Sequence, residues 1–150
     1  MNPYVRFALM LLTSGLLMYG LMYLHTYETG HVFFSQTRAW MTVIMVAGMA
    51  LVMLGFMRGM YKDARINTGI VVAAVAVFAG SLWLVRSQST VDDVSYMKAM
   101  IPHHSIAILT SERADIRDPQ VRQLADSIIE AQRREIAEMK ALIDELQARQ

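Results

Sequence analysis

The stretch "AWMTVIMVAGMALVMLGFM", residues 39–57, contains no Asp, Glu, Lys, Arg or His. As an α-helix it would extend about 29 Å, close to the roughly 30 Å hydrocarbon core of a bilayer. Two more runs without charge or histidine flank it, residues 7–24 and 69–85. The third run is short and Val-rich, which would also suit a buried strand, but Arg65, Arg86 and Trp83 around it favour a span. The sequence therefore predicts three transmembrane helices.

Charge divides the 150-residue chain into two parts near Arg86. Residues 1–85 hold five Lys and Arg against two Asp and Glu, whereas residues 86–150 hold nine against eleven. Hydrophobic residues make up 55% of the chain, and its mean hydropathy is +0.33. We therefore expect a transmembrane region at 1–86, in contact with lipid, and a helical hairpin domain at 87–150.

Basic residues beside the spans predict the orientation. One side of the membrane carries Arg38 and Arg86, and the other carries four residues: Arg6, Arg58, Lys62 and Arg65. Cytoplasmic loops hold the excess of Lys and Arg, so the amino terminus should be cytoplasmic and the hairpin domain extracytoplasmic. A cleaved signal peptide is the alternative for residues 1–24, although no A-x-A-like site follows them.

A polar linker, "SQST" at 87–90, leads into the second part. Thr90 and Asp93 have the spacing of a helix start, and apolar residues then recur with a helical period. Pro102 interrupts this helix and predicts a kink or a new helix start. A second helix should begin with Asp118 as N-cap and Pro119 as its first residue, and reach about Ala148.

The two helices should pack antiparallel about residues 116–117. That register sets His104 near Ile129, and Met97 near Ile136 and Met139. Two helices alone bury a thin core, so we expect a partner hairpin from a second subunit, making a homo-oligomer, or packing against the membrane region.

The segment "YMKAMIPHHS", residues 96–105, combines thioethers and imidazoles in a chain without cysteine. On a helix Met97, Met100 and His104 share one face, while His103 points about 100° away. Thioether and imidazole ligands suit Cu(I) or Ag(I), whereas zinc seldom takes methionine. The alternative is that the methionines only fill the core and the histidine is an ordinary core or surface residue.

Two segments, "YMKAMIPHHSIAI" and "DPQVRQLADSIIEAQRREIAEMKALI", resemble the bacterial family named domain of unknown function 305. The resemblance covers about residues 92–146. It implies a ferritin-like all-α bundle, of which the hairpin would be half, and relatives that bind periplasmic copper and are linked to copper or silver tolerance. The implied location is the bacterial inner membrane with a periplasmic domain. The implied ligands are Met97, Met100, His103, His104 and Met139, with Gln132 and Glu135 as supporting partners.

The chain departs from the family where "HHSIAI" stands in place of the frequent "HHQGAI". Ser105 and Ile106 replace a glutamine and a glycine, which leaves the implied ligands intact. A kink at Pro102 could turn both His103 and His104 toward one site. If Pro102 instead begins a helix, His103 lies in its solvated first turn.

Two further groups attract attention. Methionines follow each other at i+4 through the second span and either pack or pass Cu(I) along: Met41, Met45, Met49, Met53 and Met57. In "HTYETGH", His25, Glu28 and His31 either form an auxiliary Cu(II) or Zn(II) site or are simply interfacial.

The sequence favours a membrane-anchored protein that binds Cu(I) or Ag(I) outside the cytoplasm for sequestration, tolerance or handover. The alternative is a structural or pH-sensing oligomeric membrane protein without metal, whose hairpin associates through Leu124, Ile128 and Ile136. The Glu-x-x-His pairs of a ferritin-like oxidase are missing, so we do not expect an enzyme. No motif for an organic cofactor or nucleic acid is present.

Overall fold

A computed structural model describes residues 1–149, and every regular element in this range is helical. The elements in chain order are α1 (Pro3–Leu21), η1 (Thr29–His31), α2 (Gln36–Phe56), α3 (Ala64–Ser87), α4 (Asp93–Arg113) and α5 (Pro119–Ala148). They form two compact units. Unit 1 is Met1–Met22 with Thr37–Thr90, and unit 2 is Tyr23–Gln36 with the chain from Val91 onward.

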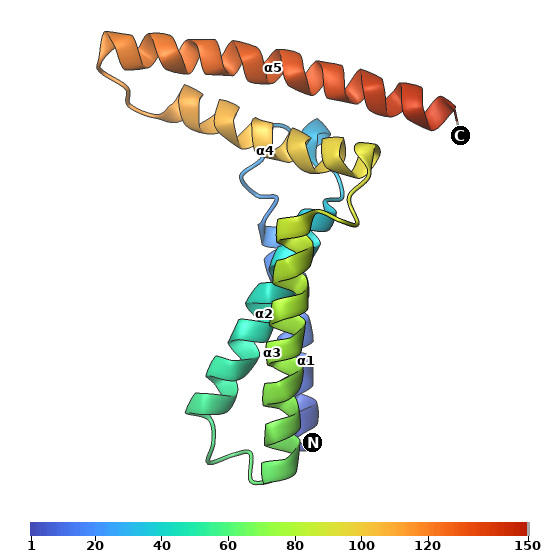
Figure 1. Ribbon diagram of the computed structural model, residues 1–150. Coiled ribbons are helices and arrows are strands. Elements are labelled where there is room, and N and C mark those ends of the chain that lie inside the picture. The colour runs from blue at the N-terminus through green and yellow to red at the C-terminus, as the bar shows by residue number, and fades with distance from the viewer. Residues whose placement is uncertain (150) are drawn as a thin grey trace. The chain divides into compact units, whose positions relative to one another are not determined.

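Unit 1 consists of α1, α2 and α3, which confirms the three predicted apolar helices (Figure 1). They are 19, 21 and 24 residues long, and each is long and apolar enough to cross a membrane. The third, predicted to be short, is the longest. The Asp63 carboxylate accepts hydrogen bonds from the N–H groups of Arg65 and Ile66, at 2.9 and 3.1 Å. This cap starts α3 five residues before the apolar run begins at Gly69.

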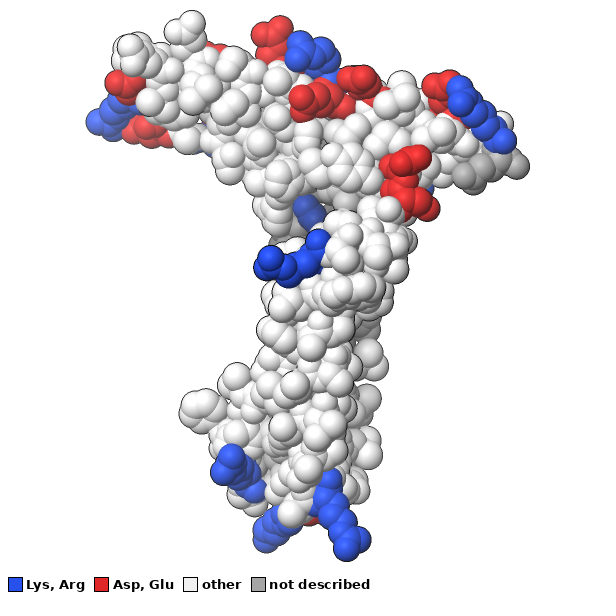
Figure 2. Space-filling model, viewed as in Figure 1, with Lys and Arg blue, Asp and Glu red and all other residues white. Residues whose placement is uncertain are grey.

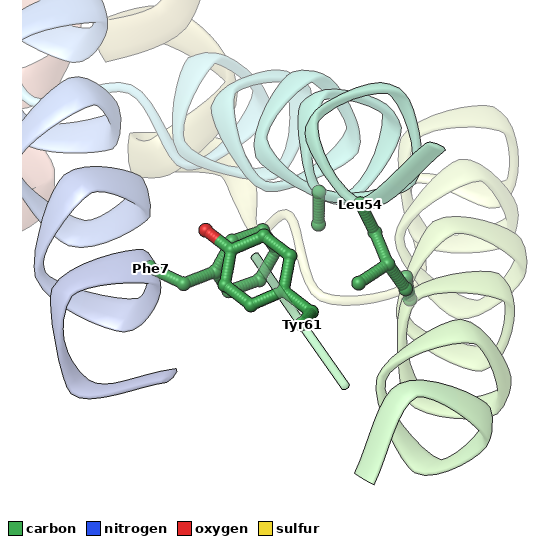
Figure 3. Close-up of a cluster of buried hydrophobic side chains, with 5 residues drawn as sticks. Phe7, Leu54 and Tyr61 are labelled. Carbon is green, nitrogen blue, oxygen red and sulfur yellow. The ribbon is translucent and has the colours of Figure 1, made fainter. Parts of the chain in front are cut away.

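Aromatic side chains close one end of unit 1. Tyr61, in the connection between α2 and α3, meets the ring of Phe7 edge to face at 5.3 Å, with Leu54 in the same cluster (Figure 3). The Tyr4 hydroxyl accepts from the N–H of Asp63 and lies 3.0 Å from a side-chain oxygen of Asn67. The start of α1 is therefore fixed to the connection between the other two helices.

The outer surface of unit 1 is apolar. Figure 2 shows its helices almost free of charge, with Lys and Arg gathered at the end where the amino terminus and the α2–α3 connection lie. Large apolar side chains such as Leu12, Leu16 and Val72 are exposed on this surface. Such a surface is stable against lipid but not against water, which is compatible with a membrane-anchored protein.

The methionine row of α2 changes its environment along the helix. Met41 and Met45 are exposed, whereas Met53 and Met57 pack against the core of unit 1. A row at i+4 winds about 40° per step around a helix, so its two ends face different surroundings. The first two methionines of the row thus face outward and the last two pack inward, while Met49 between them is half-buried.

Unit 2 is built on the antiparallel hairpin of α4 and α5 (Figure 1). Its core contains one methionine and four isoleucines: Met97, Ile101, Ile108, Ile136 and Ile143. The second helix begins as predicted, because Asp118 caps it and Pro119 is its first residue. The N-cap of the first helix is Asp92 and not the predicted Thr90, so this helix begins two residues later than expected. The Asp92 carboxylate accepts a hydrogen bond from the N–H of Ser95 at 2.7 Å.

The alternative of a new helix start at Pro102 is wrong: α4 runs without interruption from Asp93 to Arg113. Proline removes one backbone donor and crowds the preceding turn. Here Pro102 and its neighbour Ile101 are both buried, and Met97 and Ile108 hold the turns on either side against α5. Tertiary packing therefore outweighs the local cost of the proline.

The register of the hairpin also differs from the prediction. His104 lies beside Glu135, six positions further along α5 than the expected Ile129. Ala114 and Asp118 bound the connection with extended backbone, at ψ 138° and 126°, so the chain advances along the hairpin axis before α5 begins. As a result α5 starts beyond the end of α4, and Leu124 on its first turns remains 59% exposed (Figure 1).

A third element completes unit 2. The segment Tyr23–Gln36, here called the strap, belongs to this unit, and its Tyr27 and Phe33 pack against the hairpin core. The predicted division at Arg86 assigned this segment to the membrane region. The structure instead groups it with the hairpin, where Tyr27 and Phe33 are half-buried although Phe34 is 65% exposed. The strap thereby adds, from the same chain, to a core that two helices would leave thin.

Candidate metal site

The continuous course of α4 keeps Met97, Met100 and His104 on one helix face, as their spacing predicts. Met97 is 7% exposed and belongs to the hairpin core, and Met100 is half-buried. The side chain of His104 is 13% exposed. This face therefore brings two thioethers and one imidazole to the side of α4 that packs within unit 2.

His104 is held against α5 by Glu135. Its Nδ1 lies 3.0 Å from Oε2 of Glu135, which is close enough for an ion pair. The contact is poorly aligned, however, and Nδ1 is buried with no properly directed hydrogen bond from any residue between 1 and 149. The Glu135 side chain is 44% exposed and retains the freedom to rotate into line.

The surroundings of His104 favour its neutral form. Burial lowers its pKa from the ordinary value of 6.5, Glu135 acts in the opposite direction, and the neighbouring His103 lowers the pKa further. A neutral imidazole with its proton on Nδ1, where rotation of the Glu135 side chain would let the carboxylate accept it, keeps a lone pair on Nε2. A carboxylate behind one nitrogen and a free lone pair on the other is the usual arrangement of a metal-binding histidine.

His103 has a different environment from His104. It is exposed, and the two rings have their centroids 6.1 Å apart with planes inclined at 61°. The structure does not turn both histidines inward, because the helix continues through Pro102 without a break. A ligand held by both would have to bind at the edge of α4, where the buried and exposed sides meet.

The two remaining groups implied by the family lie on α5. Met139 is half-buried, one turn after Glu135, and packs against the same core cluster that contains Met97. Gln132 is half-buried on the preceding turn. The hairpin thus brings Met139 and Glu135 to the helix surface that faces α4.

The donor set of these residues can be compared with what different metals prefer. Within residues 1–149, no three His, Cys, Asp or Glu side chains are grouped closely enough to hold a metal ion. The donors on the inner face of the hairpin are one partly buried imidazole and thioethers. Such a set suits a soft ion of low coordination number.

The auxiliary group in the strap is only partly assembled. Nε2 of His31 lies 3.6 Å from Oε2 of Glu28, but His25 does not join them as a third member of a metal-binding group among the described residues. His31 is 6% exposed, and its Nδ1 lies 3.0 Å from the hydroxyl oxygen of Ser105 on α4. His31 therefore lies at an internal contact of unit 2.

Sequence reasoning missed the residues that fasten the strap. Ser105 also accepts a hydrogen bond from the backbone N–H of Tyr27 at 2.7 Å. The guanidinium of Arg133 lies 5.6 Å from the centre of the Tyr27 ring and 3.0 Å from the carboxylate of Glu112. Hydrogen bonding to Glu112 raises the pKa of Tyr27. The one available signal was the serine that follows the histidine pair, where the family often has glutamine.

Comparison with known proteins identifies a family that covers the hairpin. Residues 84–150 match the family described as Domain of unknown function (DUF305), a range that includes α4 and α5. The chain is 36% identical over 104 residues to the uncharacterized protein L153 of Acanthamoeba polyphaga mimivirus, covering 65% of this chain and 68% of that protein. No solved structure matches the chain. The protein therefore belongs to the DUF305 family and carries three apolar, membrane-compatible helices before the family domain.

Proposed function

We propose that unit 2 binds a soft monovalent metal ion, Cu(I) or Ag(I), on the periplasmic side of a bacterial inner membrane in which unit 1 is anchored. The protein would sequester the ion or hand it to another carrier, and no turnover is required. The observation that carries this proposal is the pairing of His104 with Glu135. A partly buried neutral imidazole backed by a carboxylate, on a helix face with two thioethers, has the chemistry of a soft-metal ligand.

In this proposal each side chain has a distinct role. His104 is the nitrogen ligand, and Glu135 orients it and raises its basicity. Met97, Met100 and Met139 supply thioether sulfur, which favours Cu(I) and Ag(I) over Zn(II). His103 joins from the exposed side, where the ion would enter or leave, and Gln132 supports the ligands from α5.

The test is an anaerobic titration of the full-length protein in detergent with Cu(I), in competition with a chromogenic chelator. The full chain is needed because the strap belongs to the same unit as the hairpin. His104→Ala and the pair Met97→Leu with Met100→Leu should weaken Cu(I) binding, each on the order of tenfold or more. Met60→Leu, an exposed methionine outside the hairpin, is the matched control and should bind like the wild type.

A second candidate is a structural membrane protein without metal. It is favoured by the burial of Met97 among isoleucines, since thioethers commonly fill cores. In that case the wild type would bind Cu(I) no more tightly than the His104→Ala variant does. Leucine at positions 97 and 100 would then change neither binding nor folding.

A further inference from the structure

The strap is attached to the helical turn that carries the histidine pair. Tyr27 and His31 both contact the hydroxyl of Ser105, the residue that directly follows His104, at 2.7 and 3.0 Å. These partners are 78 and 74 residues apart in the sequence. Ser105 is 0% exposed, so both contacts are protected from water. Local structure does not require this contact. It therefore joins two segments that are distant in the sequence.

The protons of this contact can be assigned. A serine hydroxyl has one proton to donate and two lone pairs. Because its oxygen accepts from the N–H of Tyr27, its own proton is free to point to Nδ1 of His31. The His31 ring proton then lies on Nε2, facing the carboxylate of Glu28 at 3.6 Å. Burial lowers the pKa of His31, which agrees with a neutral ring of this tautomer.

The size of Ser105 is as important as its hydroxyl. Because the residue is completely buried beneath the strap, a glutamine there would add three heavy atoms where no open space remains. The strap could not then approach α4 as it does. The serine that stands in place of the family's frequent glutamine thus has a physical explanation. Its small side chain leaves room for the strap, the segment that connects α1 and α2.

Two adjacent residues of α4 are consequently fixed by different elements. Ser105 is held by the strap, and His104, about 100° around the helix, is held by Glu135 of α5. Since both belong to one turn, fastening Ser105 limits rotation and translation of α4 and so limits where the His104 ring can lie. The Cα of Gly30 faces Lys140 of α5, whose Nζ would be 3.8 Å from an added Cβ, so the strap spans both helices of the hairpin.

We propose that Ser105 and His31 are positioning residues for the metal-binding turn, holding the strap on α4 so that His104 stays beside Glu135. The metal-dependent part of this inference rests on the proposed function, whereas docking of the strap does not. Neither residue needs to touch the ion. Their effect should be a preorganised His104, which raises affinity without adding a ligand.

The experiment measures two properties of the full-length protein in detergent. Hydrogen exchange of the strap without metal reports docking, and competition for Cu(I) reports affinity. Ser105→Ala removes the hydroxyl without adding any atom to this completely buried position. We expect exchange of the Tyr27 amide to accelerate about tenfold and Cu(I) affinity to fall about three- to tenfold with unchanged stoichiometry. Ser111→Ala, on the same helix, is the matched control and should change neither.

Substitutions of His31 separate positioning from bulk packing. His31→Leu removes the acceptor and should reproduce the Ser105→Ala result. His31→Asn keeps an oxygen near the position of Nδ1. This variant should retain the strap protection and the Cu(I) affinity of the wild type. Recovery by asparagine but not by leucine would show that the hydrogen bond, and not apolar burial, fixes the turn.

Each remaining outcome is decisive. If the variants release the strap but Cu(I) affinity is unchanged, the positioning role is overturned. If the strap of the wild type exchanges as fast as an unfolded segment, the docking itself is overturned. If the strap is protected and the wild type binds no Cu(I), the proposed function fails together with the positioning role, and the docked strap is then a structural element only.

Discussion

Gly15 of α1 lies so close to Val46 of α2 that a Cβ at position 15 would stand 3.0 Å from Cγ2 of Val46. Helices in lipid associate through small residues that allow such an approach. We predict that Gly15→Leu separates α1 from α2 and lowers the free energy of unfolding by about 1–3 kcal/mol. Thermal unfolding in detergent measures this effect. Gly20→Leu, on the same helix with no atom within 4 Å of the added Cβ, should unfold like the wild type.

The carboxylate of Glu135 should control metal affinity without being a ligand. Glu135→Gln keeps the shape but removes the negative charge near Nδ1 of His104. We expect Cu(I) affinity to fall about 10- to 100-fold, as is typical when the partner of a metal-binding histidine is lost. Glu138→Gln, an exposed residue on the next turn, is the control for charge alone. Equal losses for the two variants would contradict a specific role for Glu135.

Unit 2 should become less stable as the pH falls below about 6.5 in the absence of metal. Burial lowers the pKa of both His31 and His104 in the folded protein below the ordinary 6.5. The unfolded chain therefore takes up protons first, and stability decreases as the pH drops from 6.5 toward the folded pKa values. Thermal unfolding between pH 5 and 8 measures the slope. His31→Asn and His104→Gln should each flatten it, and a slope unchanged in both variants would refute this assignment.

The orientation can be tested cleanly because the chain contains no cysteine. Gln123→Cys and Gly59→Cys introduce single thiols at exposed positions in α5 and in the α2–α3 connection. A membrane-impermeant maleimide added to spheroplasts should label position 123 at once and position 59 only after the membrane is disrupted. The reverse pattern would place the hairpin in the cytoplasm.

Exposed apolar residues at the start of α5 test the predicted homo-oligomer. Leu124 and Val121 lie beyond the end of α4 and are largely uncovered, whereas Ile136, which we expected to take part in association, is buried inside the hairpin. Leu124→Glu should shift the protein toward monomer in light scattering, and Gln123→Glu on the same turn should not. A wild type that is already monomeric in mild detergent would contradict the oligomer.

The sequence contained enough information for the elements but not for their assembly. Uncharged runs of sufficient length predict the helices of unit 1, and Asp118 followed by Pro119 predicts the start of α5, because both signals are local. The register was not predictable, since it depends on how far the short connection after Arg113 extends. Continuity through Pro102 was not predictable either, because packing of Ile101 and Ile108 against α5 decides it.

Part of the candidate site could likewise be predicted from the sequence, and part could not. Helical spacing alone places Met97, Met100 and His104 on one face, and the family resemblance named Glu135. The contact of Ser105 with the strap could not be predicted from a periodic pattern of residues. It depends on one hydroxyl group whose partners are far away in the sequence. Long-range polar contacts between irregular and helical segments therefore set the limit of this type of reasoning.

The contact between the strap and α4 also limits how many times the chain between them can cross a membrane. The chain leaves the strap, passes through α2 and α3, and returns to Ser105, so the two partners can meet only if an even number of crossings separates them. Two complete spans satisfy this condition, whichever way the protein is inserted. If one of these helices failed to insert during synthesis, Ser105 and His31 would be stranded on opposite faces of the bilayer. Docking of the strap would therefore be lost whenever α2 crossed the membrane without α3, or α3 without α2.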